Sequence, residues 1–166
     1  NPQNRAISNV AALKVPPHSV DAEQAVLGGL MLDNTEWDNL ADVLLPEDFY
    51  RPEHQIIFRV MSQQSEDRSP IDVVTLMGSL NSLNELESAG GIEYLSELTD
   101  NARGTANIHA YAEIIRERAI LRRLISVANG IANSGYNTGG KKAAVVLDEA
   151  EQEVFSIADE RPQDQG

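Results

Sequence analysis

The sequence contains no cysteine, so disulfide bonds and thiolate metal sites are excluded. A chain without cysteine is compatible with a reducing compartment. Histidine is also scarce: His18, His54 and His109 lie far apart, and none has a second histidine four residues away. This spacing does not favour a metal site. We also find no pair of acids or nucleophile with a nearby base that would predict catalysis.

Basic residues are few: 13 Lys and Arg stand against 26 Asp and Glu, for a net charge of −13. Contacts to nucleic-acid phosphates require clustered cations. The chain has one such cluster, Arg116, Arg118, Arg122 and Arg123, and Glu113 and Glu117 are interleaved with it. This pattern is typical of a solvated, salt-bridged helix face. We therefore expect DNA contact to be weak or indirect, and a basic protein to be the better partner.

Long hydrophobic runs are absent as well. No apolar stretch reaches the roughly 18 residues of a membrane-spanning helix, and no signal peptide is visible. The chain starts at Asn1 and ends in the polar sequence DERPQDQG. We therefore expect no membrane association, and we expect the chain to be part of a longer protein.

Helical periodicity dominates the sequence, and no segment alternates with the period of a strand. This predicts an all-α fold. Capping residues or proline mark the expected helix starts. Ser19 caps a helix over 20–33, Thr35 and Asp38 form a capping box for the second helix, Pro52 begins the third and Asp72 caps the fourth. A fifth helix is expected over 91–99. Gly28 and Gly29 lie inside the first helix and each costs roughly 1 kcal/mol relative to alanine, which close packing would offset.

The segment 107–133 predicts one long helix whose apolar stripe changes sides at Ala119. At about 100° per residue, the stripe first comprises Ile108, Tyr111, Ala112 and Ile115, and then Ile120, Leu124, Val127, Ala128 and Ile131. A helix that is buried on two different sides must pack against two different bodies. We therefore expect its first half to cover a globular core and its second half to project from that core.

A second helix over 142–159 supplies a partner for the projecting half. Ala143, Leu147, Ala150, Val154 and Ile157 follow a coiled-coil spacing, which predicts an antiparallel hairpin. Val145 and Phe155 fall outside that seam, and pairing with a second hairpin would bury them. This favours a dimer or a ring of dimers. In the alternative, the hairpin folds back on residues 20–100 and makes a single bundle.

The turn between these helices, Gly135–Lys142, nearly matches the phosphate-binding pattern G-x-x-x-x-G-K-[ST]. However, a helix rather than a strand precedes it, and Lys142 replaces the hydroxyl residue. We therefore interpret the segment as a glycine-rich turn in which Gly135 ends the long helix. A nucleotide-binding enzyme remains the alternative.

Five separated strings resemble the N-terminal domain of DnaB-type replicative DNA helicases. They occur in the same order as in that family, over about residues 15–160: PPHSVDAEQAVLGGLMLDN (16–34), PEDFYRPEHQIIF (46–58), SPIDVVTL (69–76), GGIEYLSELTDN (90–101) and ANIHAYAEIIRERAILRRLISVANGIA (106–132). The resemblance implies a cytoplasmic bacterial protein that is a hexameric, ATP-driven 5′→3′ helicase at the replication fork. Its motor, with ATP and Mg²⁺, would lie in a C-terminal RecA-like domain absent from this chain, so we expect no catalytic residue, metal or cofactor here.

The resemblance and the patterns together predict four parts: a flexible tail (1–18), a globular helical head (19–119), a helical hairpin (120–159) and the start of a linker (160–166). The implied partners are further copies of the chain, the C-terminal helicase-binding domain of primase, and a helicase loader. The contact residues that we predict are Tyr94, Ile125, Asn129, Ile131, Val145 and Phe155. A free-standing helical adaptor is the remaining alternative.

Overall fold

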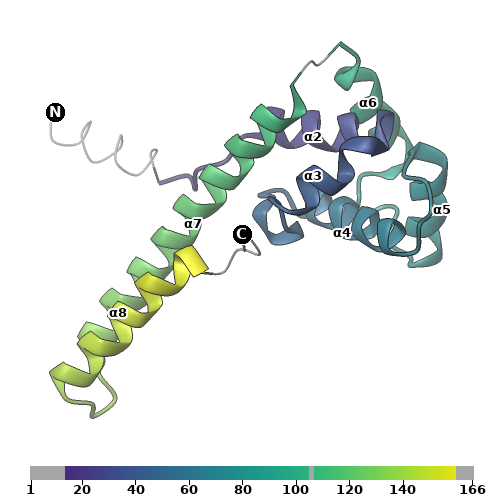
Figure 1. The fold of residues 1–166 in the computed structure, drawn as a ribbon. Coiled ribbons are helices and arrows are strands. Elements are labelled where there is room, and N and C mark those ends of the chain that lie inside the picture. The colour runs from purple at the N-terminus through teal and green to yellow at the C-terminus, as the bar shows by residue number, and fades with distance from the viewer. Residues whose placement is uncertain (1–13, 105–106, 160–166) are drawn as a thin grey trace, which may run out of the picture.

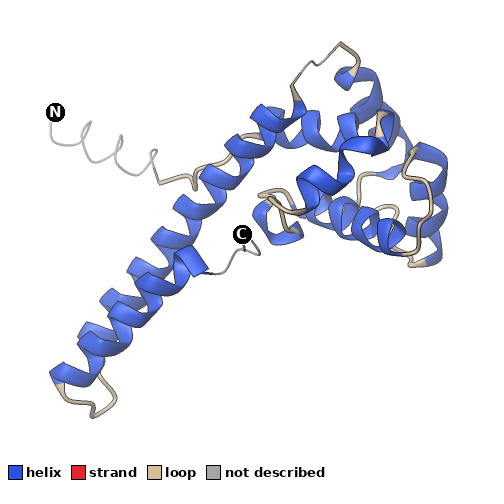
Figure 2. Ribbon diagram, in the orientation of Figure 1, coloured by secondary structure: helices blue, strands red, loops and turns tan. Residues whose placement is uncertain are grey.

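The computed structural model describes residues 14–104 and 107–159 and consists of helices and connecting loops over both ranges (Figure 2). The α-helices are α2 (Val20–Leu32), α3 (Trp37–Ala41), α4 (Pro52–Glu66), α5 (Val73–Ser82), α6 (Gly91–Ala102), α7 (Ile108–Tyr136) and α8 (Ala143–Asp159). Two short 3₁₀ helices, η1 (Asn34–Glu36) and η2 (Pro46–Asp48), flank α3. The predicted all-α class is confirmed. Most of the predicted tail and the whole predicted linker lie outside the described residues.

A globular head contains α2 to α6 and the first half of α7, and a hairpin of α7 and α8 projects from it (Figure 1). Helix α2 lies at the centre of the head and packs against both α6 and α7. Its buried residues, among them Val26, Leu27 and Leu30, point in several directions around the helix axis. The hairpin extends away from residues 20–100 (Figure 1). The alternative in which it folds back on these residues is therefore wrong.

The close packing predicted at the glycine pair is confirmed between α2 and α6. A Cβ atom added at Gly28 would lie 2.1 Å from the backbone oxygen of Leu98 and 2.7 Å from the Cβ of Ala102. At Gly29 the nearest atom would be the Cδ1 of Ile108, at 2.8 Å. The backbones of α2 and α6 can approach this closely because residue 28 has no side chain.

Most predicted helix starts are correct, but the one at Thr35 is wrong. Ser19 Oγ accepts the Ala22 N–H at 3.2 Å and Asp72 accepts the Thr75 N–H at 2.8 Å, as expected for capping residues. At Thr35, the carboxylate of Asp33 accepts both the backbone N–H (3.0 Å) and the side-chain hydroxyl (2.5 Å). The Thr35 hydroxyl is therefore occupied as a donor. The chain forms η1, and α3 begins only at Trp37.

Helix α7 passes from the head into the hairpin, and its first half is buried as predicted, at Ala112, Ile115 and Ala119. The second predicted stripe is only partly confirmed: Val127 is buried and Ile120 and Ile131 are half-buried, but Leu124 and Ala128 are exposed, because α8 covers only a narrow part of this half. The helix continues to Tyr136, with Asn137 as its C-cap, so the prediction that Gly135 ends it is wrong. The chain reverses at 139–140, within the predicted turn, where both glycines have positive φ.

The predicted seam of α8 is partly wrong. Leu147 is 61% exposed and Val154 is also exposed. Ala143 is exposed too, whereas Ala150 and Ile157 of the predicted seam are half-buried as expected. Val146, which lies outside the predicted seam, is also half-buried, and with Ala150 it lines a small hollow beside Ile131 of α7. Residues 146 and 150 lie about 60–100° around the helix from residue 147. With a single partner helix, only one narrow stripe of α8 is covered, so part of the predicted seam stays in solvent.

Candidate functional site

A chain of polar side chains runs through the otherwise apolar head. Glu23 of α2 and His54 of α4 are both almost fully buried, and Glu23 Oε1 lies 2.7 Å from His54 Nδ1. On the other side of the ring, His54 Nε2 lies 2.5 Å from the hydroxyl of Tyr94 on α6. Glu23 also accepts the backbone N–H groups of Tyr50 (2.7 Å) and Arg51 (3.3 Å). Helices α2, α4 and α6 are thus connected in a row, from the buried Glu23 carboxylate through His54 to Tyr94.

The proton positions in this chain follow from which groups can donate. With Glu23 as a carboxylate and His54 as a neutral imidazole, Nδ1 carries the hydrogen that Glu23 accepts, and Nε2 is an acceptor. The Tyr94 hydroxyl therefore donates to Nε2. Gln24 Nε2 lies 3.1 Å from the same hydroxyl oxygen and donates to it. All four side chains then have mutually compatible hydrogen bonds.

The Tyr94 side chain is also fixed by packing. Its ring lies over Gly90, where an added Cβ would be 2.6 Å from Tyr94 Cδ2, and Gly90 has a φ of 105° that favours glycine. The rings of Tyr94 and His54 are stacked, with centroids 5.9 Å apart. Partial burial raises the pKa of Tyr94 above its ordinary value. At neutral pH the residue is therefore a protonated phenol held in one orientation.

Arg122 joins the head to the hairpin where α7 leaves the core. Its guanidinium donates to the backbone oxygens of Pro17 (2.7 Å) and Asp48 (2.6 Å) and lies over the ring of Tyr50, 5.5 Å from its centroid. Burial lowers the pKa of Arg122, which nevertheless stays charged. The expectation that Arg122 lies on a solvated face is wrong, because its forked donors bind two carbonyl groups.

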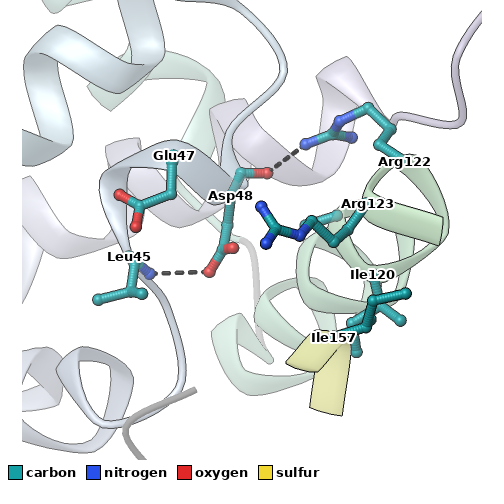
Figure 3. Close-up of a pocket in the computed structure, with 8 residues that line it drawn as sticks. Leu45, Glu47, Asp48, Ile120, Arg122, Arg123 and Ile157 are labelled. Atoms are coloured by element: carbon teal, nitrogen blue, oxygen red, sulfur yellow. Dashed lines mark hydrogen bonds between the residues drawn. The ribbon is translucent and has the colours of Figure 1, made fainter. Parts of the chain in front are cut away.

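A cavity of about 390 Å³ lies beside Arg122, between η2 and the base of the hairpin (Figure 3). Its wall includes Glu47 and Asp48 from the head and Arg123 from α7. Asp48 also closes the η2 turn by accepting the Leu45 N–H at 2.8 Å. The cavity is lined by charges of both signs, so it does not favour a ligand of one charge.

The strings that carry the family resemblance meet in these two regions. Glu23 comes from the first string, Tyr50 and His54 from the second, Tyr94 from the fourth and Arg122 from the fifth. Of these residues, the sequence predicted only Tyr94 as functional. One signal was available for His54: it precedes the apolar run Ile56–Phe58 at a helical position that is buried, where a polar residue must find a partner.

The other predicted contact residues lie on the hairpin, away from Tyr94. Ile125, Asn129, Val145 and Phe155 are exposed, and Phe155 is 72% exposed. Ile131 is half-buried and lies beside α8, so it is partly occupied within the hairpin. The structure therefore does not bring the six residues into one site. They divide into one head residue and five hairpin residues.

Further large apolar side chains are exposed on the hairpin. They share a position outside the α7–α8 contact and comprise Leu121, Leu124, Tyr136, Leu147 and Val154. Tyr136, close to the hairpin tip, is 94% exposed. A contiguous projecting element with this many uncovered apolar residues is typical of an interaction surface.

The described residues contain no group of three or more His, Asp or Glu side chains that could hold a metal ion. Among the described helices, none is long and apolar enough to cross a membrane. In the Gly135–Lys142 turn, Lys141 Nζ binds both carboxylate oxygens of Glu149 at 3.0 Å. In a phosphate-binding loop that lysine would face the phosphates, so this contact favours the hairpin-turn interpretation.

Comparisons with known proteins agree with the resemblance. The pattern of the family described as DnaB-like helicase N terminal domain matches residues 15–117. The replicative DNA helicase DnaB of Haemophilus influenzae is 48% identical over 151 residues, which cover 91% of this chain and 32% of that protein. The DnaB of Geobacillus stearothermophilus is 41% identical, covering 92% and 33%. The chain thus spans about a third of the length of these curated relatives.

Solved structures give the same result. The N-terminal domain of DnaB helicase from Mycobacterium tuberculosis aligns with a TM-score of 0.81 and 34% identity, covering 85% of this chain and 99% of that one. The N-terminal domain of DnaB from Helicobacter pylori, whose structure was described together with its interactions with primase, aligns with a TM-score of 0.59 and 29% identity, covering 70% and 90%. The chain belongs to the family of DnaB-like helicase N-terminal domains.

Proposed function

We propose that this chain is the assembly and docking module of a replicative DNA helicase. The hairpin pairs with the hairpin of a second copy, and the head and the adjoining part of α7 receive the helicase-binding domain of primase. The chain performs no catalysis in this role. It supplies the surfaces that build a ring and recruit a partner.

The uncovered apolar face of the hairpin carries this proposal. In a two-helix hairpin each helix covers one narrow stripe of the other, and here Phe155, Leu147 and Val145 remain outside that stripe. Pairing two such hairpins into a four-helix arrangement would bury these residues with the symmetry expected of a homodimer. Of the residues predicted as contacts, Val145 and Phe155 are assigned to this pairing.

The docking role is supported by the family and by the surface of the head. The H. pylori relative is described as interacting with primase, and Tyr94 is a half-buried aromatic residue held in one orientation. We assign Tyr94, Ile125 and Asn129 to this contact, with a smaller part for the half-buried Ile131. A helicase loader is a further partner of the same module, with no residue assigned to it.

The full-length protein is then a hexameric ring that unwinds DNA in the 5′→3′ direction in the bacterial cytoplasm. ATP and Mg²⁺ act in a RecA-like motor domain that is not part of this chain. Because the chain is strongly acidic, its own contact with DNA is weak or indirect.

Sedimentation velocity of the chain, alone and titrated with the primase C-terminal domain, tests both roles together. We expect concentration-dependent self-association and a faster-sedimenting complex after primase is added. A strict monomer that ignores primase would contradict both roles for the isolated chain. Self-association without a primase complex would leave only the assembly role.

A further inference from the structure

We infer that the cavity between η2 and the base of the hairpin is the docking site of the segment 160–166 of this same chain, and that Glu160 and Arg161 are the side chains that enter it. The docked segment fastens the end of α8 to the head. Both the site and its occupant belong to one copy of the chain, so the inference goes beyond hairpin pairing and primase docking. Under the proposed function this segment leads toward the motor domain, and its docking would fix the direction in which that connection leaves the head.

The cavity lies where α8 returns to the head. Its volume of about 390 Å³ falls within the roughly 300–1,000 Å³ of sites that hold small ligands, so it has room for one or two side chains. Figure 3 shows Glu47 and Asp48 of the head on one side of it, and Arg123 of α7 and Ile157 of α8 on the other. The described residues end at Asp159, two positions after Ile157. The next residues therefore leave α8 beside the cavity.

The segment reaches the cavity whether it is extended or helical. In an extended chain, the Cα of Glu160 lies at most about 10–11 Å from that of Ile157, at about 3.3–3.6 Å per residue. If the helix ran on, residues 160 and 161 would share the face of residue 157, because they lie three and four positions after it. Pro162 disfavours a helical conformation at Arg161, so the helix would end beside the cavity. A tether this short gives an effective concentration on the order of mM.

The charges of the cavity match those of the segment. The head contributes two acids, Glu47 and Asp48, and α7 contributes two arginines. An occupant with a single charge would meet attraction and repulsion together. Glu160 and Arg161 carry opposite charges on adjacent residues, and Arg161 is the only cation of the segment. Arg161 then faces the acids of η2 and Glu160 faces the arginines of α7.

Glu47 is the acid on which the contact can be tested. Its side chain is exposed, and no described Lys, Arg or His forms an ion pair with it. Asp48 is almost fully buried, and its carboxylate closes η2 by accepting the Leu45 N–H at 2.8 Å. Changing Asp48 would therefore disturb the head itself. The apolar wall, which includes Ile157, shields an ion pair in the cavity from salt better than open solvent does.

The distance between two spin labels tests the inference. Because the chain has no cysteine, Gln63→Cys, at an exposed position of α4, and Gln163→Cys, in the segment, can be labelled specifically. Excess unlabelled chain removes distances between copies. A free segment from 159 to 163 would spread the second label over about 10–12 Å, the end-to-end scale of four flexible residues. We expect the parent chain to give a single distance distribution less than about half as wide.

Charge variants in this labelled chain identify the contact. Arg161→Gln changes no residue of the head and should broaden the distribution to the width of a free segment. Arg103→Gln is the matched control, because it removes the same charge at an exposed position after α6 and should leave the width unchanged. Glu47→Arg alone should broaden the distribution by repulsion. Glu47→Arg combined with Arg161→Glu restores opposite charges and should recover the narrow distribution.

Each outcome decides for or against the docked segment. A broad distribution in the parent chain would overturn the inference, and so would a narrow one that Arg161→Gln leaves unchanged. A distribution that is narrow only without dilution would mean that the segment enters the cavity of a second copy, which also overturns it. Failure of the exchanged pair to recover the narrow distribution would overturn the contact between Glu47 and Arg161. Circular dichroism checks that each variant is folded, and if a Glu47 variant does not fold, Arg161→Gln still decides. The measurement needs no primase, so failure of the proposed function is seen separately.

Discussion

At position 28 the distance between two helices depends on the absence of one methyl group. Because a Cβ there would lie 2.1 Å from the backbone oxygen of Leu98, we expect Gly28→Ala to force α2 and α6 apart. The cost should be about 1–3 kcal/mol of unfolding free energy, despite the better helix propensity of alanine. Urea denaturation followed by circular dichroism measures it.

Gly78→Ala is the matched control, because residue 78 also lies inside a helix and an added Cβ would meet no atom within 4 Å. There the propensity gain should dominate and stabilise the head by up to about 1 kcal/mol. Equal effects at the two positions would contradict the close-packing explanation for Gly28.

Arg122 is the second residue whose role depends on its shape. Arg122→Lys keeps the charge, but the single ammonium cannot reproduce the fork that binds the oxygens of Pro17 and Asp48. We expect a loss of about 1–3 kcal/mol, the range for hydrogen bonds to charged groups. Hydrogen exchange should show faster exchange around residue 17 and in η2. Arg116→Lys, at a position without such contacts to the described residues, should be nearly neutral.

The residues of the buried polar chain could not be predicted from periodicity. A helical pattern indicates which positions face a core. From their spacing to apolar neighbours it can place His54 and Glu23 on buried faces, but it cannot show that they contact each other. Their pairing requires α2, α4 and α6 to meet, which is a property of the tertiary structure. The same applies to Arg122: its charge suggested solvent, but two backbone carbonyls from distant segments hold it.

At the scale of elements, prediction was accurate where local chemistry determines the outcome. Ser19, Pro52 and Asp72 start helices because caps and prolines act on the adjacent backbone alone. The change of sides along α7 followed from residue angles in the same way. Errors arose where two local solutions compete, as at Thr35, where Asp33 takes the available donors, and along α8, where the sequence cannot tell which stripe faces α7 and which faces another molecule.

Phe155 tests the assignment of that second stripe. Because the side chain is 72% exposed in the single chain, Phe155→Ala should change the unfolding free energy by no more than about 0.5 kcal/mol. It should weaken self-association at least about tenfold, since truncating a buried interface aromatic costs about 2 kcal/mol or more. Sedimentation velocity measures the association, and circular dichroism checks that the head stays folded.

Ile157→Ala provides the contrast, because Ile157 is half-buried at the base of the hairpin. It should destabilise the chain itself, by roughly 2 kcal/mol at the lower end of the range for buried isoleucine. General unfolding of the head by Phe155→Ala would show that the residue belongs to the intramolecular core and would remove it from the pairing surface.

At the scale of the whole molecule, the net charge of −13 affects the two proposed interactions in opposite ways. Pairing two copies brings like charges together, so electrostatics opposes it. Docking a basic partner on this acidic chain brings unlike charges together, so electrostatics assists it. Hairpin pairing must therefore derive its free energy from apolar burial, whereas docking derives part of it from charge.

These opposite dependences predict a crossing salt response in one chain. Raising the ionic strength from about 10 mM to about 150 mM shortens the Debye length from about 30 Å to about 8 Å. Over this range we expect self-association to strengthen and primase affinity to weaken, each severalfold, as measured by sedimentation and titration calorimetry on the same preparation. Weakening of both would mean that the hairpins pair through charges, in conflict with an apolar interface. Strengthening of both would mean that primase is held by apolar contacts, which would leave Ile125 rather than Tyr94 as the centre of docking.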